Sequence, residues 1–207
     1  AANQAGVSTF MTGFNEFNGI PVTGSEYLLR DLLKNKWGFQ GFVISDWASI
    51  EEMVTHGYAR DKADAANKAV KAGVDMDMES SSFVDELIGL IQTGAVREEL
   101  IDDAVRRILK VKFLLGLFDD PYKYCDAERE LQTIGSEENR KAVLDMAKKS
   151  IVLLKNENNL LPLKKNGQKI AVIGPLADDS NSVLGSWRIA SEDSSGVSIV
   201  EGLKQYT

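Results

Sequence analysis

The first half of the chain carries three apolar, strand-like runs, and a helical pattern follows each of them. The runs lie at 7–14, 41–45 and 73–78, with starts roughly 33 residues apart, a typical βα repeat length. The helical patterns are predicted at 25–36, 61–72, 83–92 and 98–115. Parallel strands joined by helices indicate an α/β fold, and the run 41–45 suits a strand buried on both faces.

Three βα units make a poor sheet on their own, because an edge strand stays unpaired. A (β/α)₈ barrel contains eight units in about 250 residues. We therefore interpret residues 1–118 as the last βα units of a TIM-type barrel. The polar stretch 119–135, with Asp119-Asp120-Pro121 at its start, is predicted to be an interdomain linker.

Residues 136–207 are predicted to begin a second α/β domain. Ser136 can cap a helix whose first turn holds Glu137 and Glu138, where the helix dipole favours negative charge. Strands are expected at 151–154 and 169–174, and 177–198 reads as a loop rich in Ser, Asp and Gly.

Charge and cysteine content narrow the functional classes. The formal net charge is −7, which argues against a nucleic-acid binder and against a polybasic membrane contact. The longest apolar runs fall far below the roughly 20 residues that span a bilayer. A single cysteine excludes an internal disulfide, a cysteine-based zinc cage and an iron–sulfur cluster. No metal or organic cofactor is expected.

Polar side chains follow each of the three predicted strands, where catalytic groups of a barrel are found. They are Asn15 and Glu16, then Ser45, Asp46 and Trp47, then Asp75, Asp77 and Glu79. A carboxylate beside an aromatic ring suits glycoside hydrolysis, in which a carboxylate nucleophile and a carboxylic acid flank the bond.

Each of these residues also has a structural interpretation. An Asp at a strand end often caps a helix or anchors a loop, and Trp47 can belong to a core or an interface. Asp75, Asp77 and Glu79 can alternatively ligate a divalent cation, although the spacing lacks the Gly and the distal Glu of a calcium loop.

Motifs along nearly the whole chain identify a family. The run GFQGFVISDW at 38–47 resembles the nucleophile motif of glycoside hydrolase family 3. Further segments resemble that family in the same order, and they lie at 11–15, 18–23, 72–78, 104–122, 150–163, 169–175 and 185–187. The resemblance is greatest to periplasmic-type bacterial β-glucosidases and β-xylosidases. It implies the C-terminal part of a (β/α)₈ barrel followed by the start of an α/β sandwich domain.

The resemblance also implies a retaining, exo-acting β-glycosidase that works on oligosaccharides or aryl β-glycosides. Asp46 would be the nucleophile, and Trp47 would border the site of the leaving-group sugar. Phe14 stands where many members carry a Tyr that donates a hydrogen bond to the nucleophile, so other groups would tune Asp46 here. Trp187 would contribute from the second domain.

The same resemblance places the general acid/base beyond Thr207 and the residues that grip the non-reducing sugar before Ala1. Glu16 or Glu79 could be nominated as the acid on position alone. We therefore expect this polypeptide to be inactive without the remainder of the enzyme, and we expect the enzyme to be periplasmic or extracellular. A β-N-acetylhexosaminidase of the same family and a non-catalytic carbohydrate-binding protein on the same scaffold are the alternatives.

Overall fold

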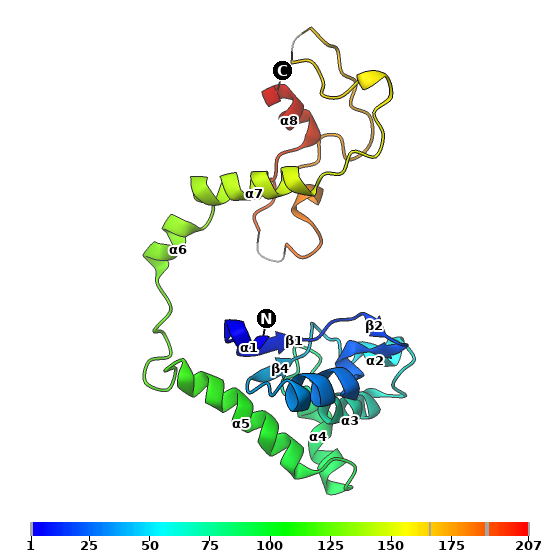
Figure 1. The fold of residues 1–207 in the computed structure, drawn as a ribbon, viewed down its shortest axis with the longest axis vertical. Coiled ribbons are helices and arrows are strands. Elements are labelled where there is room, and N and C mark those ends of the chain that lie inside the picture. Colours follow the sequence, from blue (N-terminus) through cyan, green and yellow to red (C-terminus); the bar gives the residue numbers. More distant parts are fainter. Residues whose placement is uncertain (1, 166, 189–190, 207) are drawn as a thin grey trace. The chain divides into compact units, whose positions relative to one another are not determined.

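The computed structural model describes residues 2–165, 167–188 and 191–206. The chain divides into two compact units, residues 1–128 and 129–207 (Figure 1). The division falls inside the predicted linker 119–135. The boundaries of the barrel part and of the second domain remain predictions.

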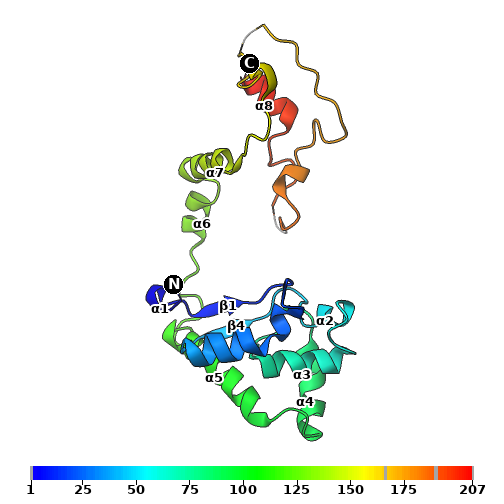
Figure 2. The same cartoon turned by 45° about the vertical axis from the view of Figure 1, so that its right-hand side comes forward.

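A small parallel sheet forms the centre of the first unit. β1 (Thr9–Met11) pairs with β4 (Phe42–Ile44), with Phe10 opposite Val43 (Figure 2). Gly41 lets the two strands approach closely, because a Cβ there would lie 2.0 Å from the carbonyl oxygen of Ser8. The predicted third strand at 73–78 is reduced to one parallel bridge, between Ile44 and Met76.

Two short strands follow β1. β2 (Glu16–Phe17) and β3 (Ile20–Pro21) form an antiparallel hairpin, followed by the 3₁₀ turn η1 (Val22–Gly24). Asn18 and Gly19 both have positive φ, 54° and 77°, which is the backbone that a two-residue hairpin turn requires.

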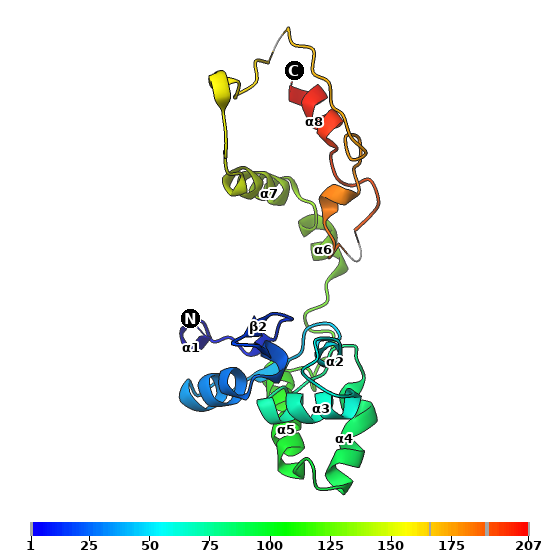
Figure 3. The same ribbon diagram turned by 90° about the vertical axis from the view of Figure 1, so that its right-hand side faces the viewer.

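The helices of the first unit are α1 (Ala2–Ala5), the π-helix η2 (Tyr27–Lys36), α2 (Glu52–Thr55), α3 (Lys62–Ala72), α4 (Ser82–Gln92) and α5 (Glu98–Leu114). Four of them, η2, α3, α4 and α5, lie close to their predicted ranges, although η2 is a π-helix, and the two short helices α1 and α2 were not predicted. The N-cap position of η2 is Glu26, which makes no side-chain cap bond, and the preceding Ser25 accepts the Leu28 N–H through its hydroxyl at 3.4 Å. The Asp61 carboxylate accepts the Asp64 N–H at the start of α3, which packs against α4 (Figure 3).

One face of the sheet packs on these helices. Val43 is fully buried and shares a core with Leu29 and Leu33 of η2 and with the alanine face of α3. The other face is more open: Met11 is 58% exposed, and Phe42 and Ile44 are half-buried. The expectation that strand 41–45 is buried on both faces is therefore wrong for the described residues. The alternation of side chains across a strand explains the difference, because the helices cover only one side.

The second unit contains helices and loops. They are α6 (Ala127–Thr133), which begins before the division, α7 (Glu137–Ser150), the short 3₁₀ turns η3 (Glu157–Asn159) and η4 (Ser182–Leu184), and α8 (Ile199–Tyr206). The predicted cap is confirmed, since the Ser136 hydroxyl accepts the Asn139 N–H.

The strands expected at 151–154 and 169–174 are not formed in this unit. A strand needs a neighbour to pair with, and neither segment has one among the described residues. Leu154 is 92% exposed and Ile173 is 91% exposed, so no packed layer covers these runs here. Across both units, the helices that the structure describes are too short or too polar to cross a membrane.

Candidate active site

The carboxyl ends of the strands of the first unit meet at one edge. The Thr12 N–H donates to the carbonyl of Ile44 at 3.0 Å, so pairing with β4 continues past β1. The Ser45 N–H donates to the carbonyl of Met76 at 2.9 Å, so the segment at Met76 lies beside β4 where a third strand would pair. The backbone segments that follow the strands therefore lie side by side at one edge, as parallel pairing requires.

Asp46 lies two residues after the end of β4 at this edge, and it is half-buried. The carboxylate oxygen Oδ1 accepts the N–H of Trp47 at 2.7 Å. The other oxygen, Oδ2, accepts no hydrogen bond from any residue that the structure describes. One oxygen is thus held by the backbone while the other is free to react, which suits a carboxylate nucleophile.

The turn that carries Asp46 is held by its neighbours. The Ser45 hydroxyl, fully buried, donates to the Asp46 carbonyl at 2.9 Å and accepts the Met78 N–H at 2.8 Å. Ala48 has a φ of 54°, a left-handed conformation that costs a residue with a Cβ roughly 1–2 kcal/mol. Its N–H donates to the Met78 carbonyl at 2.9 Å, which helps to hold that conformation.

Trp47 lies on the surface beside Asp46, with 49% of its area exposed. An indole ring that is half accessible can stack on a ligand, whereas a core tryptophan cannot. The interpretation of Trp47 as a core residue is therefore not favoured for the described part of the chain.

Sequence reasoning missed a group of buried hydroxyls around Asp46. The Asp46 N–H donates to Thr12 Oγ1 at 3.3 Å, and Thr12 Oγ1 lies 2.8 Å from Thr23 Oγ1. Thr23 Oγ1 lies 3.0 Å from Ser49 Oγ. A signal was available, because Thr12 interrupts an apolar strand run and a buried hydroxyl must find a partner.

Asp75, a strand-end candidate, is part of the core instead. Its Oδ1 lies 2.6 Å from Lys34 Nζ and its Oδ2 accepts the Val43 N–H at 2.8 Å. Burial raises the pKa of Asp75 and lowers the pKa of Lys34, and each charge opposes the shift of the other. The pair ties η2 to the start of the third strand position, so its role is structural.

Asp77 and Glu79, which also follow the third strand position, make no hydrogen bond to Asp46 among the described residues. Asp77 accepts the Ser80 hydroxyl at 2.7 Å and the Phe83 N–H at 3.2 Å, so it holds the start of α4. Glu79 is exposed. Among the described residues no three carboxylate, histidine or cysteine side chains are grouped as a metal site would need. The cation alternative for Asp75, Asp77 and Glu79 is therefore not supported.

Phe14 and Trp187, the other two predicted site residues, make no hydrogen bond to Asp46 among the described residues. Phe14 is half-buried in the segment between Thr12 and β2, and its phenyl ring has no atom that can hydrogen-bond to Asp46. Trp187 is 66% exposed and belongs to the second unit, so its relation to Asp46 remains a prediction.

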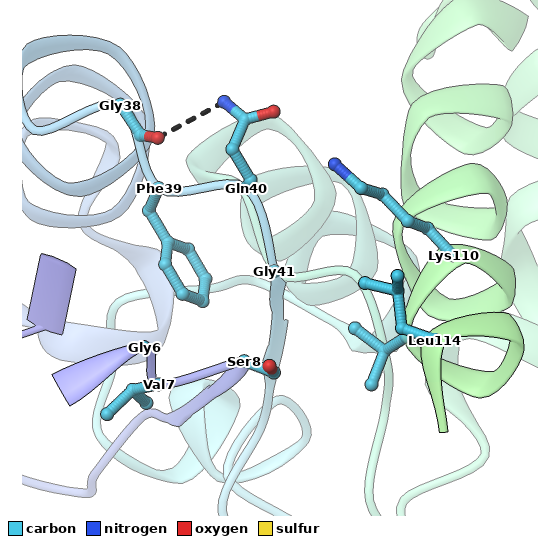
Figure 4. Close-up of a pocket in the computed structure, with 10 residues that line it drawn as sticks. Gly6, Val7, Ser8, Gly38, Phe39, Gln40, Gly41, Lys110 and Leu114 are labelled. Atoms are coloured by element: carbon cyan, nitrogen blue, oxygen red, sulfur yellow. Dashed lines mark hydrogen bonds between the residues drawn. The ribbon is translucent and has the colours of Figure 1, made fainter. Parts of the chain in front are cut away.

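A pocket of about 400 Å³ opens at the opposite end of the strands (Figure 4). It is lined by Ser8 and Gly41, which precede β1 and β4, and by Lys110 and Leu114 of α5. Asp46, Trp47, Phe14 and Trp187 do not line it. The pocket is therefore separate from the candidate site around Asp46.

Curated proteins that are similar to this chain are named as glycosidases. The chain is 41% identical to the periplasmic beta-glucosidase of Salmonella typhimurium, covering 99% of this chain and 27% of that protein. It is 37% identical to a beta-xylosidase of Formosa agariphila, covering 99% of this chain and 30% of that protein. The chain thus spans less than a third of the length of these relatives.

Solved structures show the same likeness. The beta-glucosidase of Listeria innocua in complex with glucose is 40% identical, with a TM-score of 0.76, over 99% of this chain and 28% of that one. Residues 1–111 match the model of the glycosyl hydrolase family 3 N terminal domain, and residues 151–207 match that of the family's C-terminal domain. With more than half of its length matched by the first model, the chain belongs to glycosyl hydrolase family 3.

Proposed function

We propose that this chain is part of a retaining, exo-acting β-glycosidase, a β-glucosidase or β-xylosidase, with Asp46 as its nucleophile. The observation that carries the proposal is the Asp46 carboxylate at the carboxyl edge of the sheet, with Oδ1 held by the Trp47 N–H and Oδ2 unpartnered among the described residues. Other carboxylates near this edge, Asp75 and Asp77, are occupied by structural contacts. The names of the relatives supply the substrate class.

The first unit would be the C-terminal part of a (β/α)₈ barrel, and the second would begin an α/β sandwich domain. The parallel order of β1, β4 and the bridge at Met76 supports the barrel interpretation. The chemistry would then lie at the carboxyl ends of the strands, where Asp46 is found. Trp47 would border the leaving-group sugar, and Phe14 and Trp187 would contribute further walls of the site.

In the reaction, Asp46 Oδ2 attacks the anomeric carbon of a terminal β-D-glycosyl residue. A carbon–oxygen bond to Asp46 forms as the glycosidic bond breaks, and the departing oxygen takes a proton from a carboxylic acid and leaves as an alcohol. Water then attacks the same carbon, the bond to Asp46 breaks, and the partner, now a carboxylate, accepts the proton of the water.

The carboxylic acid of this scheme must come from elsewhere in the enzyme. Retaining glycosidases hold their two carboxyl groups about 5–5.5 Å apart. Glu79 lies near the edge by sequence but is exposed, and the family resemblance places the acid further along the second domain. The substrate and the remainder of the enzyme are therefore the partners that this chain needs, and the polypeptide alone is expected to be inactive.

Denaturing mass spectrometry of the full-length protein after incubation with a 2-deoxy-2-fluoro-β-glucoside, and in parallel the xyloside, tests the proposal. We expect a covalent adduct that peptide mapping assigns to Asp46, and an Asp46→Asn variant that forms none and loses turnover by at least about a thousandfold. Asp77→Asn is the matched control, because it removes a charge near the same edge without touching Asp46.

A non-catalytic sugar-binding protein gives a different result. The wild type would then form no adduct and show no turnover on either glycoside, and Asp46→Asn would change only sugar affinity. We also propose a periplasmic or extracellular location, because the Salmonella relative is named as periplasmic. Fractionation of the source cells, with glycosidase activity released by osmotic shock or found in the medium, tests that location.

A further inference from the structure

A closed ring of hydrogen bonds includes the backbone N–H and the carbonyl of Asp46. The Asp46 N–H donates to Thr12 Oγ1, which contacts Thr23 Oγ1, which in turn lies 3.0 Å from Ser49 Oγ. The Ser49 N–H then donates back to the Asp46 carbonyl at 3.1 Å. The hydroxyls come from the end of β1, from η1 and from the turn after β4, so the ring joins three separate segments to the proposed nucleophile.

The donor and the acceptor of each hydrogen bond in the ring follow from the groups involved. A backbone N–H can only donate, so Thr12 Oγ1 accepts from Asp46 and its own hydrogen is free to point at Thr23 Oγ1, 2.8 Å away. Thr23 in turn can donate to Ser49 Oγ at 3.0 Å, with the Gly13 carbonyl at 3.3 Å as a second acceptor. The hydroxyl chain therefore runs from the Asp46 N–H to Ser49 Oγ, and the backbone N–H of Ser49 closes it on the Asp46 carbonyl.

Packing alone does not call for hydroxyls at these positions. Thr12, Thr23 and Ser49 are 4%, 1% and 3% exposed. Valine has nearly the shape of threonine and buries no polar atom, so an apolar core would be served as well by Val at both threonine positions. Thr12 and Ser49 contact the turn that carries Asp46 and the left-handed Ala48.

We propose that Thr12 and Thr23 are positioning residues that fix the Asp46 peptide and thereby aim its carboxylate. Asp46 Oδ1 is anchored on the next peptide N–H, that of Trp47, so a rotation of this turn would move the anchor and the attacking oxygen together. The inference rests on the proposed glycosidase function.

The test uses Thr12→Val and Thr23→Val in the full-length protein, with Thr12→Ser as the conservative variant. The control is Thr93→Val, because among the described residues the Thr93 hydroxyl bonds only to helix α4, at the carbonyls of Gly89 and Leu90. The measurements are the rate of covalent labelling by the 2-fluoro glycoside, kcat and KM on an aryl β-glycoside, and the melting temperature.

We expect each valine variant to lower the labelling rate and kcat by about tenfold, the effect of one hydrogen bond felt at the transition state, with KM nearly unchanged. Thr12→Ser should recover most of the rate, because it keeps the hydroxyl. Thr93→Val should match the wild type. If Thr12→Val does not fold, Thr23→Val carries the same test, since it removes a ring hydroxyl that does not itself contact Asp46.

The possible failures are distinguishable. Valine variants that are labelled as fast as the wild type, with only a lower melting temperature, would overturn the positioning role and leave the proposed function standing. A wild type that neither labels nor turns over either glycoside would overturn the proposed function, and this inference with it.

Discussion

The two units of this chain differ in how their apolar residues are covered. In the first unit Val43, Ile50 and Met53 are fully inaccessible, and the helices that follow each strand supply the cover. In the second unit the apolar run 151–154 is between 62% and 92% exposed, and no apolar side chain described beyond residue 111 is fully buried.

The difference shows what a βα repeat can do locally. A strand and the helix that follows it in sequence close one face of a sheet by themselves, as β4 and α3 do. A strand without a sequential partner depends on segments far along the chain, because its backbone groups and both faces must be satisfied by neighbours. The first unit is built from the former kind of element and the second from the latter.

Hydrogen exchange of the 207-residue polypeptide tests this difference between the two units most strongly. We expect the amides of Phe42 and Ser45, which are bonded to Ser8 and Met76, to exchange at least about a hundredfold more slowly than those of 151–154. Equal protection in the two segments would mean that the second unit builds a sheet of its own. In a full-length family member the contrast should shrink, because more chain is available to pair with 151–154.

Removing one partner of an ion pair should affect the two units very differently. Asp75→Ala leaves Lys34 buried without its counter-charge and the Val43 N–H without an acceptor, which should cost the full-length protein about 3–5 kcal/mol of unfolding free energy. Asp145→Ala removes the partner of Lys149 in α7, where both side chains are more than half exposed, and should change little. Urea unfolding measures both, and a similar loss in the two variants would contradict this account.

Helix caps give a smaller and more even comparison. Asp61 caps α3 in the first unit by accepting the Asp64 N–H at 2.8 Å, and Ser136 caps α7 in the second by accepting the Asn139 N–H at 3.3 Å. Replacing either residue by Ala should cost about 1 kcal/mol, because capping depends on the local backbone and not on the surrounding core. A much larger loss at Asp61 in thermal unfolding would show that its cap also supports tertiary packing.

The sequence predicted correctly the elements whose formation depends on neighbouring residues in the chain. The helices α3, α4 and α5 and the Ser136 cap follow from apolar period and capping residues alone. The strands at 151–154 and 169–174 could not be predicted correctly, because apolar runs show β propensity without showing whether a neighbour is present to pair.

In the candidate site, too, the residues predicted correctly are those that depend on local sequence. Asp46 and its exposed neighbour Trp47 were found from their place after an apolar run. The burial of Asp75 was not, because its partner Lys34 lies on η2 and a lysine on a helix reads as a solvated residue. The Thr12–Thr23 contact was missed for a related reason: it joins two segments whose proximity depends on how the β2–β3 hairpin folds back.

The smallest expected effect is a pH dependence that belongs to the first unit. The backbone N–H of Arg60 and the ammonium of Lys68 hold the pKa of Asp64 below its usual value, against the opposing effect of burial. A carboxylate with a lowered folded-state pKa stabilises the protein fully above its unfolded pKa, about 3.9, and loses that contribution as the pH falls through the folded value. We therefore expect Asp64→Asn to be less stable than the wild type at pH 6, and the difference to narrow below about pH 4 as the wild type itself loses the carboxylate contacts.

Asp102→Asn is the matched control, because no hydrogen bond or ion pair to Asp102 is found among the described residues. Chemical unfolding at pH 6 and pH 3 measures the effect, and a difference that grows on acidification would mean that Asp64 does not carry its charge in the folded state.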